Sequence, residues 1–150
     1  MQAMIRKANK QDLGSLREFL SRANLGTDGL NDETVDYFLL LENEDGTLRG
    51  SLGMEAFAEN GLLRSLVVSP GQADKEIFLL FDQMVQLAKE KGMEHLYLAT
   101  NKSVALPFFE LMGFQQLDLE QEELPADFYH SEHIRHVFNV DNSLFLKFSL

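Results

Sequence analysis

Three apolar segments separated by two short polar turns constrain the fold more than any other feature of this sequence. The first turn, Glu42–Thr47, contains Asp45-Gly46, a pair that tolerates the positive φ of a tight hairpin. The second turn is Ala58–Gly61. Because short turns join antiparallel neighbours, a β-meander is predicted. Its strands are Phe38–Leu41, Leu48–Phe57 and Leu62–Val68.

The pattern becomes helical after the meander. From Glu76 to Lys91 apolar residues recur with a period near 3.6, which predicts a long helix over about Asp74–Lys91 that ends at Gly92. Shorter helices are predicted at Leu13–Leu20, Val35–Tyr37 and Ser103–Met112, and further strands at Met4–Ala8, His95–Ala99, Phe114–Leu117 and Leu144–Leu150. This order predicts an α/β (α+β) fold with a mixed, mostly antiparallel central sheet and helices on both faces.

Composition limits the functional classes. The 150 residues carry no repeat or linker, which predicts a single domain over 1–150. A net charge of -11 opposes binding to nucleic acid and to anionic lipid. The absence of cysteine excludes disulfides, thiolate metal sites and cysteine nucleophiles, and fits a cytoplasmic protein. No apolar run is long enough for a membrane span, and the first residues lack a signal-peptide core, so no membrane partner is expected.

One histidine cluster is a candidate metal site. His130, His133 and His136 lie three residues apart, with Glu132 among them, so two imidazoles would share one face of a helix. The spacing is weak evidence without cysteine or a second ligand cluster. We expect solvent-exposed histidines and no metal.

Two segments resemble the GCN5-related N-acetyltransferase (GNAT) superfamily, and the resemblance extends over nearly the whole chain. They are Leu62–Pro70, before the long helix, and Ala105–Phe114, which matches the family's last helix and its Gly-Phe exit. The tail, from Leu124–Phe128 through Ser143–Lys147, looks like a subgroup of small bacterial members that resemble arsenic-resistance and N-acetylglutamate-synthase-like acetyltransferases. The resemblance implies transfer of an acetyl group from acetyl-CoA to a small-molecule amine by direct attack.

The resemblance also implies a cofactor site. Backbone groups of Leu66, Val67 and Val68 would pair with the pantetheine arm, and amides from Gln72 to Ile77 would hold the pyrophosphate. The family's usual Arg-Gly-Lys-Gly-Ile-Gly in this loop corresponds here to Ala73, Asp74, Lys75, Glu76, Ile77 and Phe78, so its arginine and glycines are lost. In one interpretation a degenerate anion loop survives with Lys75 as its cation. In the other, Asp74 and Glu76 merely cap the helix.

Candidate catalytic groups follow from the same resemblance. Phe108 and Phe109 are placed at the cofactor site, and Phe109 occupies the slot of the family's tyrosine acid, although it has no proton to give. Glu55 is the candidate general base, or else a solvated strand residue. Arg64 and Ser65 are placed to meet a substrate carboxylate, unless Arg64 pairs with an acidic neighbour.

Two further hypotheses stay open beside the enzyme. The chain is either catalytic or a non-catalytic descendant of this fold that binds another ligand or partner, a view favoured by the altered loop and by Phe109. A homodimer that pairs splayed strand edges is compatible with both. The acceptor stays unnamed, because it would be contacted by variable loops such as Asn24–Asn31.

Overall fold

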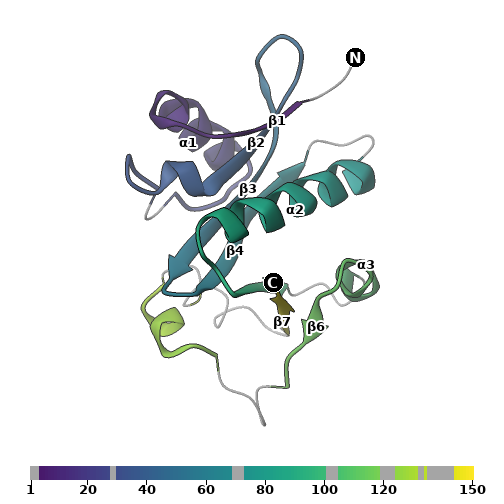
Figure 1. The fold of residues 1–150 in the computed structure, drawn as a ribbon. Helices are drawn as coiled ribbons and strands as arrows, with labels where there is room; N and C mark the ends of the chain where they lie inside the picture. The colour runs from purple at the N-terminus through teal and green to yellow at the C-terminus, as the bar shows by residue number, and fades with distance from the viewer. Residues whose placement is uncertain are drawn as a thin grey trace. The chain divides into compact units, whose positions relative to one another are not determined.

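The computed structural model describes residues 4–27, 30–68, 73–100, 105–118, 124–131, 134 and 144–150. The strands form one sheet in the order β1-β2-β3-β4-β5-β7-β6 (Figure 1). The strand bounds are β1 Met4–Lys7, β2 Phe38–Glu42, β3 Leu48–Phe57, β4 Asn60–Val68, β5 His95–Thr100, β6 Gln115–Gln116 and β7 Leu144–Ser149. The helices are α1 Leu13–Arg22, α2 Ala73–Glu90 and α3 Leu106–Leu111, with short 3-10 turns η1 Lys10–Asp12, η2 Val35–Tyr37 and η4 Ala126–His130.

The predicted fold class is confirmed. The ladders β1–β2, β2–β3, β5–β7 and β6–β7 are antiparallel, and β4–β5 is parallel. The chain divides into two compact units, the first made of Met1–Glu55 with Arg64–Leu87 and the second of Ala56–Leu63 with Ala88–Leu150. The strands β3 and β4 each contribute residues to both units. The single domain expected over 1–150 stays a prediction.

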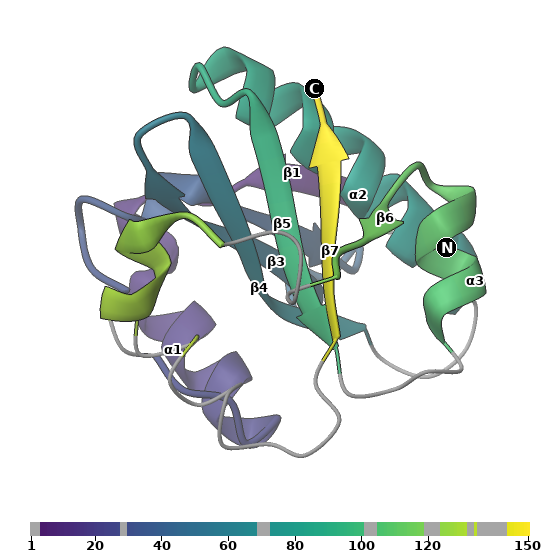
Figure 2. The same ribbon diagram turned by 90° about the horizontal axis from the view of Figure 1, so that it is seen from below.

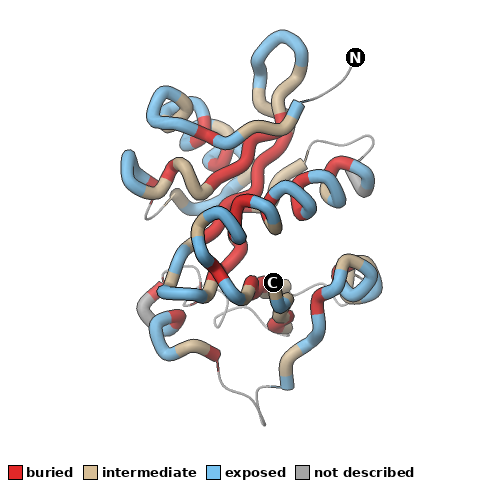
Figure 3. Tube along the Cα trace, viewed as in Figure 1, coloured by how far each residue is buried: buried red, intermediate tan, exposed pale blue. Residues whose placement is uncertain are grey.

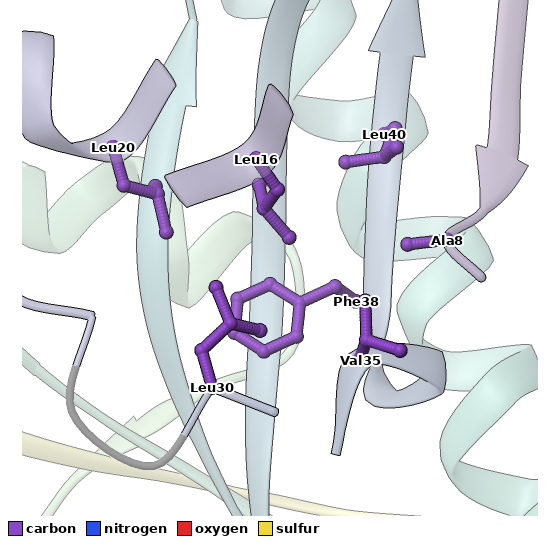
Figure 4. Close-up of a cluster of buried hydrophobic side chains, with 7 residues drawn as sticks. All are labelled: Ala8, Leu16, Leu20, Leu30, Val35, Phe38 and Leu40. Carbon is purple, nitrogen blue, oxygen red and sulfur yellow. The ribbon is translucent and has the colours of Figure 1, made fainter. Parts of the chain in front are cut away.

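In the first unit, helix α1 covers β2 through a small apolar core. Asn9 begins the helical segment with a capping box, in which its side chain accepts from the Gln11 N–H while the Asp12 carboxylate accepts from the Asn9 N–H. The inward residues Leu16 and Leu20 of α1 are fully buried. They pack in one cluster with the residues shown in Figure 4, namely Ala8, Leu30, Val35, Phe38 and Leu40.

The strand β2 is buried on both faces. Phe38, Leu39, Leu40 and Leu41 are all buried, although side chains of a strand alternate between its faces (Figure 3). Phe38 and Leu40 contact the α1 cluster, so Leu39 and Leu41 face the other side. Helix α2 lies on that side of the sheet, opposite α1 (Figure 2).

In the second unit, β5 and β7 pair over six positions, from His95↔Ser149 to Thr100↔Leu144, and run side by side in Figure 2. Phe128 is fully buried and makes edge-to-face ring contacts with Phe57 and Tyr97. The turn η4 that carries Phe128 was absent from the sequence prediction.

The ends of several strands and helices differ from the predicted ones. β4 begins at Asn60 rather than Leu62, because Ala58 takes a positive φ of 54° and the hairpin turn needs two residues. α3 begins at Leu106, with Pro107 in its first turn, whereas the predicted start at Ser103 lies outside the described residues. β6 keeps only two of its four predicted residues. Among the described residues, no helix is both long enough and apolar enough to span a membrane.

Candidate functional site

The strand β4 carries an irregularity at Ser65, in the middle of the candidate site. Ser65 has a φ of +59°, a conformation that non-glycine residues in strands rarely adopt. Its carbonyl oxygen accepts a 2.7 Å hydrogen bond from the Ser51 hydroxyl of β3. Ser51 is fully buried and Ser65 is 9% exposed. A residue in the left-handed region interrupts the regular geometry of a strand, as in a β-bulge, and we call this irregularity the bulge at Ser65.

The residues after this bulge are the predicted pantetheine partners. Leu66, Val67 and Val68 are each half-buried. On the neighbouring strand, Gly50 lies so close that a Cβ there would stand 2.8 Å from the Val67 carbonyl oxygen. Only glycine therefore fits opposite this part of β4 without a shift of the backbone.

Glu55 and Arg64, two candidates predicted for separate roles, bind each other. Arg64 Nη1 donates to Glu55 Oε1 over 2.9 Å, and its Nη2 donates to the Gly26 carbonyl over 3.2 Å. The Arg64 Nε lies 3.3 Å from Ser65 Oγ. The Glu55 side chain is 24% exposed and that of Arg64 only 11%. The structure therefore brings Glu55, Arg64 and Ser65 together and joins them to the loop after α1.

Glu76 is buried in the first part of α2 and bound to a residue that the sequence analysis missed. Arg49 Nε donates to Glu76 Oε2 over 2.6 Å, and this hydrogen bond raises the pKa of the Arg49 guanidinium. The second oxygen, Oε1, is buried without a hydrogen-bond partner among the described residues. Glu76 thus turns toward β3 rather than serving as a simple helix cap, and Arg49 compensates the charge that the sequence suggested would oppose a phosphate.

The rest of the predicted pyrophosphate loop is described only in part. Gln72 lies outside the described residues, and for Ala73 and Asp74 only the backbone is described, as the start of α2. Lys75 is exposed and Ile77 half-buried, while Phe78 is 37% exposed. The expected cation of the loop therefore stands at the surface in the first turn of α2.

Phe108 and Phe109 belong to the second unit. Phe109 is 8% exposed and packs edge-to-face against Phe108, with ring centroids 5.7 Å apart, and against Phe114 at 6.3 Å. Gly113, with a φ of +110°, ends α3 and faces the Phe148 ring. These contacts give Phe109 a packing role in the second unit.

The predicted histidine cluster lies mostly outside the described residues, since His133 and His136 are not described and the side chain of His130 is not either. In the described part of the chain, no group of three or more His, Asp or Glu side chains is arranged to hold a metal ion.

Comparisons with known proteins bear on the fold. No family model matches the sequence. The chain is 29% identical over 144 residues to the uncharacterized protein YwlB of Bacillus subtilis (strain 168), and the match covers 95% of each chain. It superimposes on N-acetylglutamate synthase from Neisseria gonorrhoeae, crystallised with coenzyme A and N-acetyl-glutamate, with a TM-score of 0.76 and 22% identity; all of this chain matches 35% of the synthase. This chain therefore spans about a third of the synthase.

A second structural match covers nearly the whole of both proteins. This chain superimposes on an acetyltransferase of the GNAT family from Staphylococcus aureus Mu50 with a TM-score of 0.71 and 21% identity, over 99% of both chains. The protein has the GNAT fold. The resemblance drawn from Leu62–Pro70 and Ala105–Phe114 is thereby confirmed at the level of the fold. Within this GNAT fold, the β4 residues and Glu55 stay predicted site residues. The sequence analysis did not consider Ser51 and Arg49, because a serine and an arginine within an apolar strand give no indication of which residues they bind.

Proposed function

We propose that this chain is an N-acyltransferase that moves an acetyl group from acetyl-CoA to the amine of a small molecule by direct attack. The observation that carries this proposal is the positive φ of Ser65 in β4 of a GNAT fold, with the Glu55 carboxylate bound to the adjacent Arg64. The likeness to a synthase crystallised with coenzyme A and N-acetyl-glutamate supports both the acyl donor and a small acceptor.

The described residues fit a CoA-type ligand in two respects. The first amides of α2, at its positive end, and the exposed Lys75 suit a pyrophosphate. The negative charge of Glu76 is taken up by Arg49. Leu66, Val67 and Val68 would bind the pantetheine arm through their backbone, and the amides from Gln72 to Ile77 would hold the phosphates.

The chemistry needs one base and one leaving group. The acceptor nitrogen attacks the thioester carbonyl, a C–N bond forms, and the C–S bond breaks to release the CoA thiolate. Glu55 removes the proton from the amine, directly or through water, as a general base. Water protonates the thiolate, because Phe109 has no hydroxyl. No acyl-enzyme is formed on cysteine, since the chain has none.

Arg64 and Ser65 have a more specific proposed role than carboxylate binding alone. The Arg64 guanidinium already contacts Glu55, Ser65 and Gly26. A substrate carboxylate that reaches Arg64 would take the place of the Gly26 carbonyl, whose 3.2 Å contact with Nη2 is longer than the 2.9 Å contact of Nη1 with Glu55. Arg64 would then hold the base and the acceptor on one guanidinium, with Ser65 beside them.

The experiment that tests this function is a thiol-release assay with acetyl-CoA and a panel of small amines and amino acids. We expect turnover with at least one acceptor, and a loss of about a hundredfold in kcat for Glu55→Gln, which keeps the shape but not the base. Glu59→Gln, at an exposed carboxylate in the β3–β4 turn, is the matched control and should keep full activity. Turnover that survives in Glu55→Gln would remove Glu55 from the mechanism.

A second candidate function is a non-catalytic module of the GNAT fold. The buried Glu76, at a position where the family keeps a small loop residue, and the hydroxyl-free Phe109 favour it. The two candidates differ in whether acetyl-CoA binds: a ligand at a hundred times its Kd adds about 2.7 kcal/mol to the free energy of unfolding. A thermal melt unchanged by acetyl-CoA would favour the second candidate.

We also propose a cytoplasmic protein that forms a homodimer. The lack of cysteine supports a reducing compartment. The strands β1 and β6 at the two ends of the sheet order have edges that could pair with a second copy. Light scattering on the purified chain decides between monomer and dimer.

A further inference from the structure

We infer that Ser51 is a positioning residue, whose hydroxyl holds the Ser65–Leu66 peptide in the orientation that lets β4 bind the pantetheine arm of an acyl-CoA. This inference rests on the proposed function. Ser51 is not part of the predicted site, and its hydroxyl binds the backbone carbonyl of Ser65.

The burial of Ser51 is the first observation behind this inference. Its side chain lies in β3 with no exposure to solvent, where a hydroxyl without a partner is costly and an alanine would pack without that cost. Its hydrogen bond goes to the carbonyl of Ser65, over 2.7 Å. The hydroxyl of Ser51 therefore serves to bind the Ser65 carbonyl at the bulge.

The conformation of Ser65 is the second observation. Its φ of +59° is unfavourable for a residue with a Cβ, so the surrounding structure must hold it. The Ser51 hydroxyl fixes its carbonyl and the Arg64 Nε contacts its hydroxyl. Two independent contacts thus act on one unfavourable residue.

The direction of the next amide follows from peptide geometry. In a planar trans peptide the C=O and the following N–H point in opposite directions. Because the Ser65 carbonyl points at Ser51 of β3, the Leu66 N–H points away from Ser51. Gly50 precedes Ser51 in β3. Because it has no Cβ, it leaves room for the Val67 carbonyl oxygen, which would lie only 2.8 Å from a Cβ at this position. The consecutive small residues Gly50 and Ser51 of β3 thus accommodate the carbonyls of Val67 and Ser65 of β4.

The test compares three variants with the wild type. Ser51→Ala removes the hydroxyl. The double variant Ser51→Ala, Ser65→Gly tests the reason for its effect, because glycine adopts a positive φ without help. Ser131→Ala is the matched control, since Ser131 is also a buried serine, 4% exposed, and its hydroxyl accepts from the Ile134 N–H in the second unit.

Each variant is titrated calorimetrically with CoA and with 3′,5′-ADP, the nucleotide half of CoA that lacks the pantetheine arm. We expect Ser51→Ala to raise the Kd for CoA roughly fivefold, the worth of one hydrogen bond, and to leave the Kd for 3′,5′-ADP unchanged. The double variant should recover most of the CoA affinity, and Ser131→Ala should behave as the wild type. A general loss of structure would weaken binding of both ligands.

A second measurement separates this inference from the proposed function. The NMR coupling between the amide proton and Hα of residue 65 reports its φ, and in Ser51→Ala it should move toward the value of an extended strand. Wild type that binds no CoA would overturn the proposed function, while the coupling still decides whether Ser51 fixes the bulge. Equal CoA affinity in wild type and Ser51→Ala, or an unchanged coupling, would overturn the inference by itself.

Discussion

The Nε of Arg49 donates a 2.6 Å hydrogen bond to Oε2 of Glu76, while Oε1 of the same carboxylate is buried without a hydrogen-bond partner among the described residues. This pair joins the start of β3 to the start of α2, and it encloses a carboxylate whose residue is only 8% exposed. Removal of one member of such a pair leaves a charge in a poorly solvated place.

Arg49→Met is therefore expected to lower the melting temperature by several degrees. The methionine keeps the apolar stem but leaves the Glu76 carboxylate without its cation. Glu76→Gln in the same background should recover part of the loss, because the amide carries no charge. Arg22→Met is the control: Arg22 and Glu18 form an exposed pair on α1, with side chains 75% and 63% exposed, and its loss should shift the melt little. Equal shifts in Arg49→Met and Arg22→Met would contradict the burial of Glu76.

Asp12 predicts a pH dependence of stability. Two hydrogen bonds from Arg6, 2.6 and 2.7 Å long, lower the pKa of the Asp12 carboxyl below its ordinary value of 3.8, and the Asn9 N–H adds to this effect. The folded state thus binds this proton less readily than the unfolded state. The stabilisation is complete above about pH 4 and is lost as the pH falls through the lower folded pKa.

The measurement is urea unfolding of wild type and Asp12→Asn at several pH values. We expect Asp12→Asn to cost about 1 to 2 kcal/mol at pH 7, the worth of a cap joined to a charged hydrogen bond. The difference should shrink as the pH falls below 4. A difference that persists unchanged into strong acid would show that the Asp12 carboxylate is not the source of the effect.

Gly50→Ala tests the close approach of β3 to β4. Its Cβ would stand 2.8 Å from the Val67 carbonyl oxygen, which belongs to the backbone and cannot rotate away. We expect a loss of about 1 to 3 kcal/mol in the free energy of unfolding, as for other overpacked sites. Gly14→Ala, where an added Cβ meets nothing within 4 Å on α1, should instead stabilise the chain by up to about 1 kcal/mol. Two variants of the same chemistry thus have opposite expected signs, measured by urea unfolding.

Phe109→Tyr tests whether this position takes part in acid catalysis. Phe109 is packed between two other rings and is 8% exposed, so a new hydroxyl is expected to cost about 1 to 3 kcal/mol of stability. Turnover, in a preparation shown to be folded, should stay unchanged. An increase of tenfold, about 1.4 kcal/mol of barrier, would instead show that protonation of the thiolate limits the wild type.

The sequence predicted the order of strands and helices because that order is written in local signals. The Asp45-Gly46 turn and the helical period from Glu76 onward depend on neighbours in the chain, and both predictions agree with the structure. The bulge at Ser65 could not be predicted, because its positive φ is held by Ser51 from another strand. For the same reason the sequence could offer an acidic neighbour as one interpretation of Arg64 but could not name Glu55 as that partner.

The ladder between β5 and β7 has a consequence for the order in which the chain folds. β5 pairs with β4 at three positions but with β7 at six, and β7 lies far downstream in the sequence. During synthesis, the edge of β5 that pairs with β7 stays without this partner until Ser149 has left the ribosome. Leu96, Tyr97 and Leu98, whose positions pair with β7, are all buried in the finished fold. Nascent or truncated chains that lack β7 should therefore tend to aggregate through β5.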